Sequence, residues 1–115
     1  MASQFKHVTL VGGGVGITPL RAIIDEITEG TTIDVVYRAR EEVDLVLKHE
    51  LEDLVAKKGI KVHYLVGSRK EHPINEFTLK KYVPRFPDSD VYVCGPESLI
   101  EDVVDASKEI GRAHV

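Results

Sequence analysis

The chain has 115 residues, of which 43% are hydrophobic and 30% charged, and its formal net charge is −4. This length fits one domain with its own core but is short for a complete enzyme with two substrate sites. The negative charge disfavours nucleic acid as the main partner. No apolar run reaches the ~20 residues of a membrane span, and the first residues show no signal-peptide pattern. The single cysteine, Cys94, excludes an internal disulfide and fits a cytoplasmic location.

Apolar runs and helical spacings alternate along the chain. Residues 1–5 are interpreted as a linker or cloning remnant, and the domain is expected to occupy 6–115. Strands are predicted at 7–12, 33–37, 60–66 and 91–94, and helices at 19–28, 43–58, 76–82 and 97–110. This alternation indicates βαβ units, and the continuous apolar character of the strands is typical of a parallel sheet covered on both faces. We therefore predict a three-layer α/β/α doubly wound sheet with strand order 3-2-1-4 and at most a partial fifth strand.

A glycine-rich turn follows the first predicted strand. It contains Gly12, Gly13, Gly14 and Gly16 and runs into a helix with Pro19 in its first turn. Such turns bring bare backbone N–H groups close to a bulky anion, commonly a pyrophosphate, at a helix N-terminus. The turn is not a Walker loop, because no lysine follows Gly16, and Ile17 stands where the Gly-x-Gly-x-x-Gly fingerprint needs its last glycine. A tight turn without a ligand is the alternative.

Basic residues follow the second and third predicted strands, at the sheet edge where ligands bind in open parallel sheets. Arg38 and Arg40 stand where an NAD site usually carries an acidic residue, and Ser68 and Arg69 follow the third strand. A guanidinium group matches phosphate geometry and keeps its charge. The pattern predicts a phosphorylated ligand and favours a 2′-phosphate. In the alternative interpretation, the arginines pair with Glu41, Glu42 or Asp44 on a solvated face.

Cys94 ends the fourth predicted strand and is followed by Gly95, Pro96 and Glu97. No histidine stands at a neighbouring strand end to activate the thiol, so we expect Cys94 to lie beside a ligand ring rather than act as a nucleophile; an ordinary buried cysteine is the alternative. The five histidines lack metal-ligand spacing, so no metal site is predicted.

Four segments in order carry a family resemblance: Gly12–Pro19, Tyr37–Arg40, Val66–Arg69 and Val93–Glu97. Together they resemble the pyridine-nucleotide domain of ferredoxin–NADP reductase-type flavoproteins, over about residues 6–112. The sequences of Arg38–Arg40 and Leu65–Arg69 are most similar to those of the bacterial membrane ferric-reductase-like branch. That branch joins a haem-bearing membrane part to a cytoplasmic reductase part.

The resemblance implies an NADP(H)-binding domain, with NADP(H) preferred over NAD(H), that presents nicotinamide for hydride transfer to a flavin. It implies that Ser68 and Arg69 grip a 2′-phosphate with help from Arg38 or Arg40, that Cys94 lies near nicotinamide C4, and that Glu97 positions the reacting ring. The implied nucleotide-binding residues are Gly12, Gly13, Gly14, Val15, Gly16, Thr18, Pro19, Tyr37, Arg38, Arg40, Gly67, Ser68, Arg69, Cys94, Gly95 and Pro96. FAD or FMN would be bound mainly by a flavin-binding barrel, the implied partner. In the narrower branch, electrons would pass to haem in a membrane domain and this domain would lie on its cytoplasmic face.

The sequence also departs from the family pattern. It contains no Arg-x-Tyr-Ser/Thr flavin motif, it lacks the usual terminal strand with its aromatic residue, and Leu99 stands where methionine is frequent. We therefore expect the isolated domain to bind nucleotide without completing electron transfer. A nucleotide-sensing or interaction module with the same fold is the second hypothesis, and a methyltransferase-like site is disfavoured by arginine at the position expected to be acidic.

Overall fold

The computed structural model describes residues 7–27 and 30–109, without the side chains of Val15 and Glu109. The predicted linker at 1–5 and the predicted start of a fifth strand near the C-terminus lie outside the described residues.

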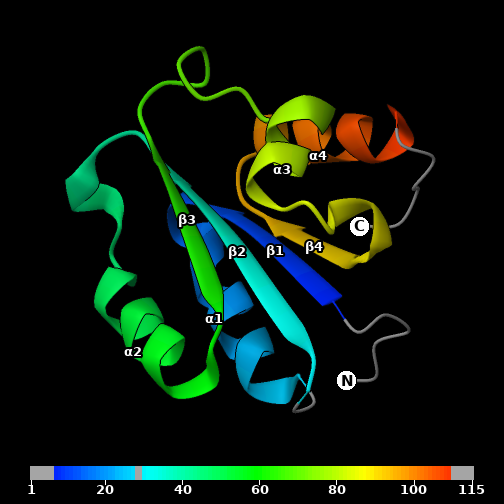
Figure 1. The fold of residues 1–115 in the computed structure, drawn as a ribbon. Helices are drawn as coiled ribbons and strands as arrows, with labels where there is room; N and C mark the ends of the chain where they lie inside the picture. The colour runs from blue at the N-terminus through cyan, green and yellow to red at the C-terminus, as the bar shows by residue number, and fades with distance from the viewer. Residues whose placement is uncertain (1–6, 28–29, 110–115) are drawn as a thin grey trace.

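Among the described residues, four parallel strands form one sheet in the order β3-β2-β1-β4 (Figure 1). The strands are β1 (His7–Gly13), β2 (Thr32–Ala39), β3 (Lys61–Val66) and β4 (Asp90–Cys94), and the helices are α1 (Ile17–Glu26), α2 (Lys48–Lys58), α3 (Glu76–Tyr82) and α4 (Glu97–Glu109). In the central pair, Leu10 lies opposite Val35 and Gly13 opposite Arg38. The predicted doubly wound architecture and strand order are confirmed.

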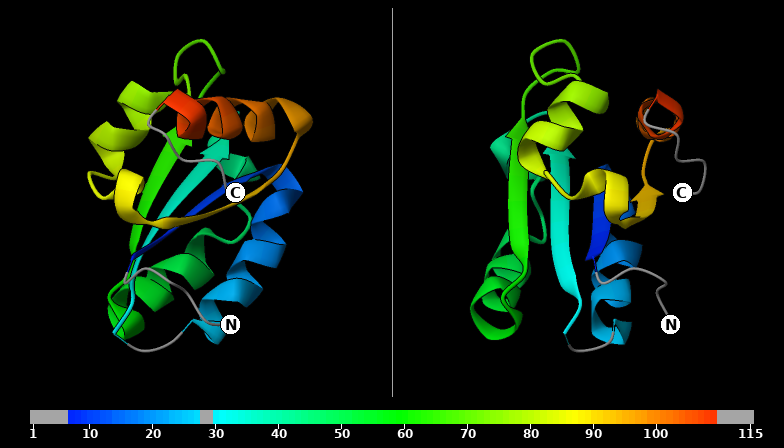
Figure 2. Two further views of the ribbon diagram at one scale, coloured as in Figure 1. Left: turned by 90° about the vertical axis from the view of Figure 1, so that its right-hand side faces the viewer. Right: turned by 45° about the vertical axis from the view of Figure 1, so that its right-hand side comes forward.

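Successive residues of a strand point to opposite faces of the sheet, so their side chains pack in two separate cores. On one face Leu10, Val35 and Tyr37 pack with buried side chains of α1 and α2. On the other face Val11 and Val36 pack with buried side chains of α3 and α4. The sheet is therefore the middle of three layers, and all its strand arrows point toward the end of the molecule that carries the loop after β3 (Figure 2).

The region predicted as one helix over 43–58 is divided, so that prediction is wrong for its first residues. A short 3₁₀ turn, Glu42–Asp44, precedes α2. The side chain of Asp44 accepts a hydrogen bond from the Glu41 backbone N–H at 3.2 Å, which closes a local capping box. Val43 and Val46 are 77% and 68% exposed. Val43 belongs to the apolar spacing that predicts a continuous helix, but its side chain is not part of either core.

The start of the first helix also differs from the prediction. A 3₁₀ turn over Gly14–Gly16 leads directly into α1, which begins at Ile17 rather than Pro19. The other predicted bounds that fall on described residues agree with those observed to within two residues, as element ends commonly do, and the predicted helix ends at 28 and 110 lie outside the described residues. The glycine segment thus forms a continuous bend from β1 into α1.

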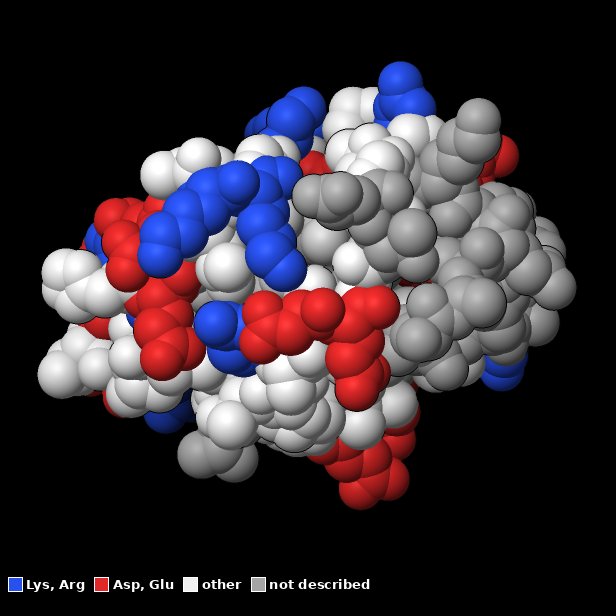
Figure 3. Space-filling view, turned by 90° about the horizontal axis from the view of Figure 1, so that it is seen from below, with Lys and Arg blue, Asp and Glu red and all other residues white. Residues whose placement is uncertain are grey.

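Basic and acidic side chains are interspersed on the end of the molecule opposite the carboxyl ends of the strands (Figure 3). In the part of the chain that the structure describes, none of the helices has both the length and the apolar character needed to cross a membrane.

Candidate functional site

The glycine turn is shaped by two different backbone requirements. Gly14 has a φ of 57°, in the left-handed region, and a Cβ there would meet nothing within 4 Å. A Cβ on Gly16, in contrast, would overlap the backbone carbonyl of Cys94. The turn is therefore open toward solvent at Gly14 and pressed against the end of β4 at Gly16.

An apolar cavity of about 460 Å³ lies where the glycine turn meets the end of β4. It is lined by Gly13, Gly14, Gly16, Pro19, Cys94, Gly95 and Pro96. Cys94 is a free, partly buried cysteine. The structure thus brings Cys94 together with the glycine turn, although these segments lie near opposite ends of the chain.

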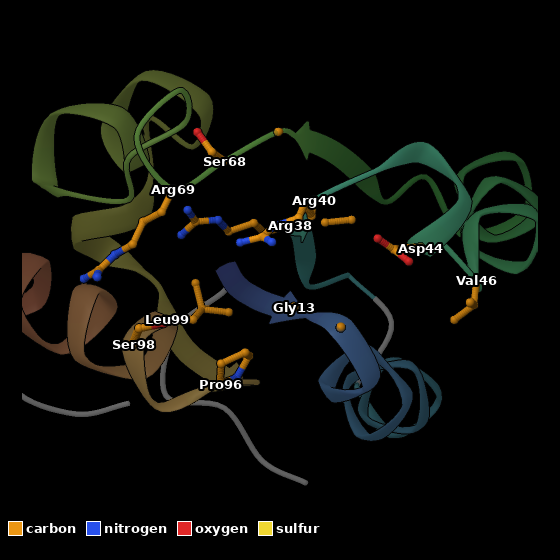
Figure 4. A pocket seen from close by; sticks show the side chains of 13 residues that line it. Gly13, Arg38, Arg40, Asp44, Val46, Ser68, Arg69, Pro96, Ser98 and Leu99 are labelled. Atoms are coloured by element: carbon orange, nitrogen blue, oxygen red, sulfur yellow. The ribbon is translucent and has the colours of Figure 1, made fainter.

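A second cavity, of about 440 Å³, lies at the carboxyl ends of β2 and β3. Its lining residues are Gly13, Gly14, Arg38, Ala39, Arg40, Asp44, Val46, Gly67, Ser68, Arg69, Pro96, Ser98 and Leu99 (Figure 4). Arg38 and Arg40 project from the end of β2 into the space between the other strand ends. Three arginines and a serine hydroxyl give this cavity side chains of the kind that bind phosphate.

The two cavities adjoin, because both are lined by Gly13, Gly14 and Pro96. One end of the combined site carries guanidinium groups, and the other is apolar with a thiol. The backbone of the glycine turn lies between them. This arrangement fits an elongated ligand with a phosphorylated end, a ring end and a connecting anion.

Two of the arginines share one carboxylate of α4. Arg69 donates from Nε to Asp102 Oδ2 at 2.9 Å and from Nη2 to Oδ1 at 2.6 Å, a bidentate pair. Arg38 Nη1 lies 4.0 Å from Asp102 Oδ2. The hydrogen bonds that Arg69 donates to Asp102, together with the negative charge of that carboxylate, raise the pKa of Arg69. Burial lowers the pKa of Arg38, while the charge of Asp102 acts in the opposite direction. The guanidinium of Arg69 turns toward α4, away from Arg38 and Arg40 (Figure 4).

Ser68 takes part in a reciprocal pair with Glu71. The Ser68 backbone N–H donates to Glu71 Oε1, and the Glu71 backbone N–H donates to the Ser68 hydroxyl, both at 3.1 Å. The hydrogen bond from the Ser68 backbone N–H, and after it the Ser68 side chain, lower the pKa of the Glu71 carboxyl. The pair fixes the turn after β3, so that Ser68 and Arg69 leave the sheet in a defined direction.

Several residues that the resemblance implied lie beside the cavities without lining them. Tyr37 is wholly buried, and its hydroxyl donates to the Asp44 carbonyl at 3.3 Å, so it supports the loop under the basic cavity. Gly12 is buried at the end of β1. Thr18 and Glu97 are exposed at the starts of α1 and α4, and neither lines a cavity described above.

Arg38 and Arg69 do pair with an acidic residue, but this residue is Asp102 and not Glu41, Glu42 or Asp44. Of the described carboxylates, it is Asp102 that lies within 4 Å of Arg38 and Arg69. Sequence reasoning missed this residue, and also Ser98, Val46 and Asp44 as lining residues. The available signal was position: Asp102 directly precedes Val103 on the buried stripe of α4, where a carboxylate needs a cationic partner.

Within residues 7–27 and 30–109, no group of three or more His, Cys, Asp and Glu side chains is arranged to hold a metal ion.

The comparison with protein families identifies the fold. Residues 10–105 match the family model described as "Oxidoreductase NAD-binding domain". The chain belongs to this family. It is 34% identical over 114 residues to NADH-cytochrome b5 reductase 2 of Scheffersomyces stipitis, matching 88% of this chain and 38% of that protein. It is 33% identical over 117 residues to the nitrate reductase [NAD(P)H] of Betula pendula, matching 90% of this chain and 13% of that protein.

A solved structure shows the same fold. The cytochrome b5 reductase domain of Ulva prolifera nitrate reductase superimposes with a TM-score of 0.74 at 23% identity, covering 96% of this chain and 46% of that one. The relatives are oxidoreductases by name, and this chain spans the NAD-binding part of such enzymes, well under half the length of the curated relatives described above.

Proposed function

We propose that the chain is the nicotinamide-nucleotide domain of a flavin-dependent reductase. The observation that supports it best is the pair of adjoining cavities, one basic and one apolar, joined along Gly13 and Gly14. A nicotinamide adenine dinucleotide has the same layout: an adenosine end, a pyrophosphate and a nicotinamide ring.

In this proposal each part of the site has a separate task. The backbone of the glycine turn binds the pyrophosphate, because Gly14 leaves open space where a side chain would otherwise stand. Pro19, Cys94 and Gly95, which line the apolar cavity, hold the nicotinamide ring, which supplies the hydride. Glu97, exposed at the start of α4, helps to position the ring from outside this cavity. Cys94 excludes water from one side of the ring and makes no covalent bond to it.

We further propose that the domain accepts a 2′-phosphate and prefers NADP(H) over NAD(H). Arg38 and Arg40 support this, because both line the basic cavity and a guanidinium binds phosphate with a charge-assisted fork. The relatives are named as NADH and NAD(P)H enzymes, so the measured preference is a strict test of the arginine argument.

The partners belong to the proposal too. The flavin, FAD or FMN, would be bound mainly by a separate barrel domain that faces the Cys94 cavity, and the electrons would pass on to haem. The bacterial membrane ferric-reductase-like branch, with a haem-bearing membrane domain and this domain at its cytoplasmic face, is the narrower proposal. The sequences of Arg38–Arg40 and Leu65–Arg69 support this narrower proposal.

A nucleotide titration followed by NMR tests the proposal. Adding NADP⁺ should shift amide resonances in four segments: 12–19, 38–40, 66–69 and 94–97. NAD⁺ should shift the same segments at higher concentration. Shifts confined to other parts of the chain would contradict the proposed function, and equal affinity for the two nucleotides would contradict the proposed preference alone.

A reconstitution tests the reaction. The domain joined to the flavin-binding barrel of a relative should oxidise NADPH in the presence of an artificial electron acceptor. Arg40→Gln in the same fusion should raise the KM for NADPH more than that for NADH. A fusion that binds flavin and nucleotide but oxidises neither NADPH nor NADH would favour the sensing-module hypothesis.

A further inference from the structure

Asp102 of α4 contacts two arginines of the basic cavity without lining the cavity itself. Its side chain is 16% exposed, and it is held between Arg69 and Arg38 rather than in solvent. Both arginines line the basic cavity, whereas Asp102 itself stands behind it on α4. The carboxylate therefore acts on the cavity through the two guanidinium groups.

The geometry at Arg69 has a direct chemical consequence. Asp102 engages Nε and Nη2, which form one of the two bidentate edges of the guanidinium. A phosphate that bound this edge would have to displace the carboxylate. A phosphate that bound the remaining edge would be repelled by the negative charge of Asp102, which stays a few ångströms away and is itself only 16% exposed.

Arg38 is affected in the same direction. Its side chain is only 12% exposed, and Asp102 is the carboxylate that the structure places within 4.0 Å of it. One negative charge is thus shared by two positive ones, and the local charge that an incoming anion meets is reduced. Arg40, which lines the same cavity from the exposed side, has no ion pair with any described residue.

We infer that Asp102 is a specificity-determining residue that competes with a 2′-phosphate for Arg69 and Arg38. The inference rests on the proposed function and deepens it. In the free protein the carboxylate holds Arg69 against α4. When a 2′-phosphorylated nucleotide binds, Arg69 exchanges one anionic partner for another. Asp102 thereby lowers the advantage of NADP(H) over NAD(H) below what three unpaired arginines would give.

Binding of adenosine 2′,5′-bisphosphate and AMP to the whole chain isolates this effect, because the two probes differ only in the 2′-phosphate. The quantity compared is the ratio of the Kd for AMP to the Kd for the bisphosphate, measured by calorimetry. In Asp102→Asn, which keeps the shape of the side chain but removes its charge, the ratio should rise by roughly tenfold.

Asp105→Asn is the matched control. Asp105 is an exposed carboxylate of the same helix, so the variant makes the same change in net charge without touching an arginine pair. Its ratio should stay within about twofold of the starting protein. A rise equal to that of Asp102→Asn would show a general charge effect and overturn the inference.

A double-mutant cycle separates competition from a structural role. Arg69→Gln should lower the ratio more in the Asp102→Asn background than in the starting protein, because Arg69 is then free for the phosphate. If Asp102 instead orients Arg69 for phosphate, Asp102→Asn lowers the ratio and the inference is wrong.

A measurement on the unmodified chain remains decisive even where Asp102→Asn does not fold. The Nε–H resonance of Arg69 should shift when the bisphosphate is added and stay in place when AMP is added. An unchanged resonance at saturating bisphosphate overturns the inference while leaving the proposed function intact. Failure of both nucleotides to bind overturns the proposed function and the inference with it.

Discussion

The two ends of the candidate site are built by different means. At the apolar end the shape comes from the backbone: the glycine turn lies directly on the carbonyl of Cys94, and a single Cβ at Gly16 has no room. At the basic end the shape comes from long side chains. There Arg38 and Arg69 meet a carboxylate of α4, and Arg69 is 58% exposed.

This difference separates what the fold determines from what individual residues determine. The apolar end is part of the packing between β1, α1 and β4, so changes there should act first on stability. The arginine side chains of the basic end are not part of the cores, so changes to them should act on nucleotide affinity with the fold intact. The following predictions test that separation, in order of decreasing effect.

Gly16→Ala should cause the largest loss of stability, about 3 kcal/mol or more in the free energy of unfolding, because the new Cβ overlaps backbone atoms that cannot move without shifting β4. Gly14→Ala is the control, since its Cβ meets nothing and only the left-handed φ of 57° is strained, at about 1 kcal/mol. Urea unfolding of both variants measures the difference. Equal losses of unfolding free energy in the two variants would mean that the contact between Gly16 and Cys94 does not stabilise the fold.

Arg40→Gln should leave the free energy of unfolding almost unchanged, because the side chain is exposed. It should weaken binding of adenosine 2′,5′-bisphosphate by roughly tenfold, as loss of a charge-assisted hydrogen bond does. AMP is the matched probe, and its affinity should change by less than about twofold. An equal loss for both probes would place Arg40 against the adenosine or the 5′-phosphate instead.

Salt should lower the binding affinity for the two halves of the nucleotide by different factors. Raising the salt concentration from about 50 mM to about 200 mM should lower the affinity for the bisphosphate by about threefold or more, because its binding depends on exposed guanidinium groups. The affinity for nicotinamide mononucleotide should fall by less than about twofold, because the apolar end presents backbone and a thiol. Calorimetry at both concentrations checks this, and parallel slopes would remove the electrostatic distinction between the ends.

The smallest effect is expected in the turn after β3. Hydrogen bonds from Ser68 lower the pKa of Glu71, so the turn is stabilised above the ordinary pKa of glutamate and loses that contribution as the pH falls through the lowered value. The Ser68 amide resonance should therefore titrate at a pH below the usual glutamate range. Glu71→Gln should abolish this titration while the resonances of β1 stay unchanged. A midpoint at the ordinary glutamate pKa would show that the pair contributes nothing.

The parts that could be predicted from sequence depend on local patterns. Apolar runs with glycine or proline stops predict the strands and helices. The rule that ligands bind at the carboxyl ends of parallel strands predicts that Arg38, Ser68 and Cys94 lie at one edge of the sheet. The strand order then followed from the doubly wound arrangement and is confirmed.

The parts that failed depend on tertiary contacts. Val43 fits a helical spacing, yet the Glu41–Asp44 capping box takes the chain out of the helix there. Tyr37 belongs to one of the segments that resemble the family, and the structure buries it wholly, so its predicted role in nucleotide binding stays a prediction. The position of Asp102 beside the buried stripe of α4 indicates that it needs a cationic partner. Which arginines pair with it depends on the tertiary packing, because Arg38 and Arg69 are far away in the chain.

The contact of Gly16 with the Cys94 carbonyl also has a consequence for how the protein folds. The first strand lies beside the last of the four strands, so this junction joins segments of high sequence separation and closes a long loop. Native packing of the glycine turn must therefore wait until β4 has docked on β1. In refolding experiments, protection of the amides at residues 13–17 from hydrogen exchange should appear together with protection of β4 and after that of the β1–β2 pair. Nucleotide binding would then report the completed sheet.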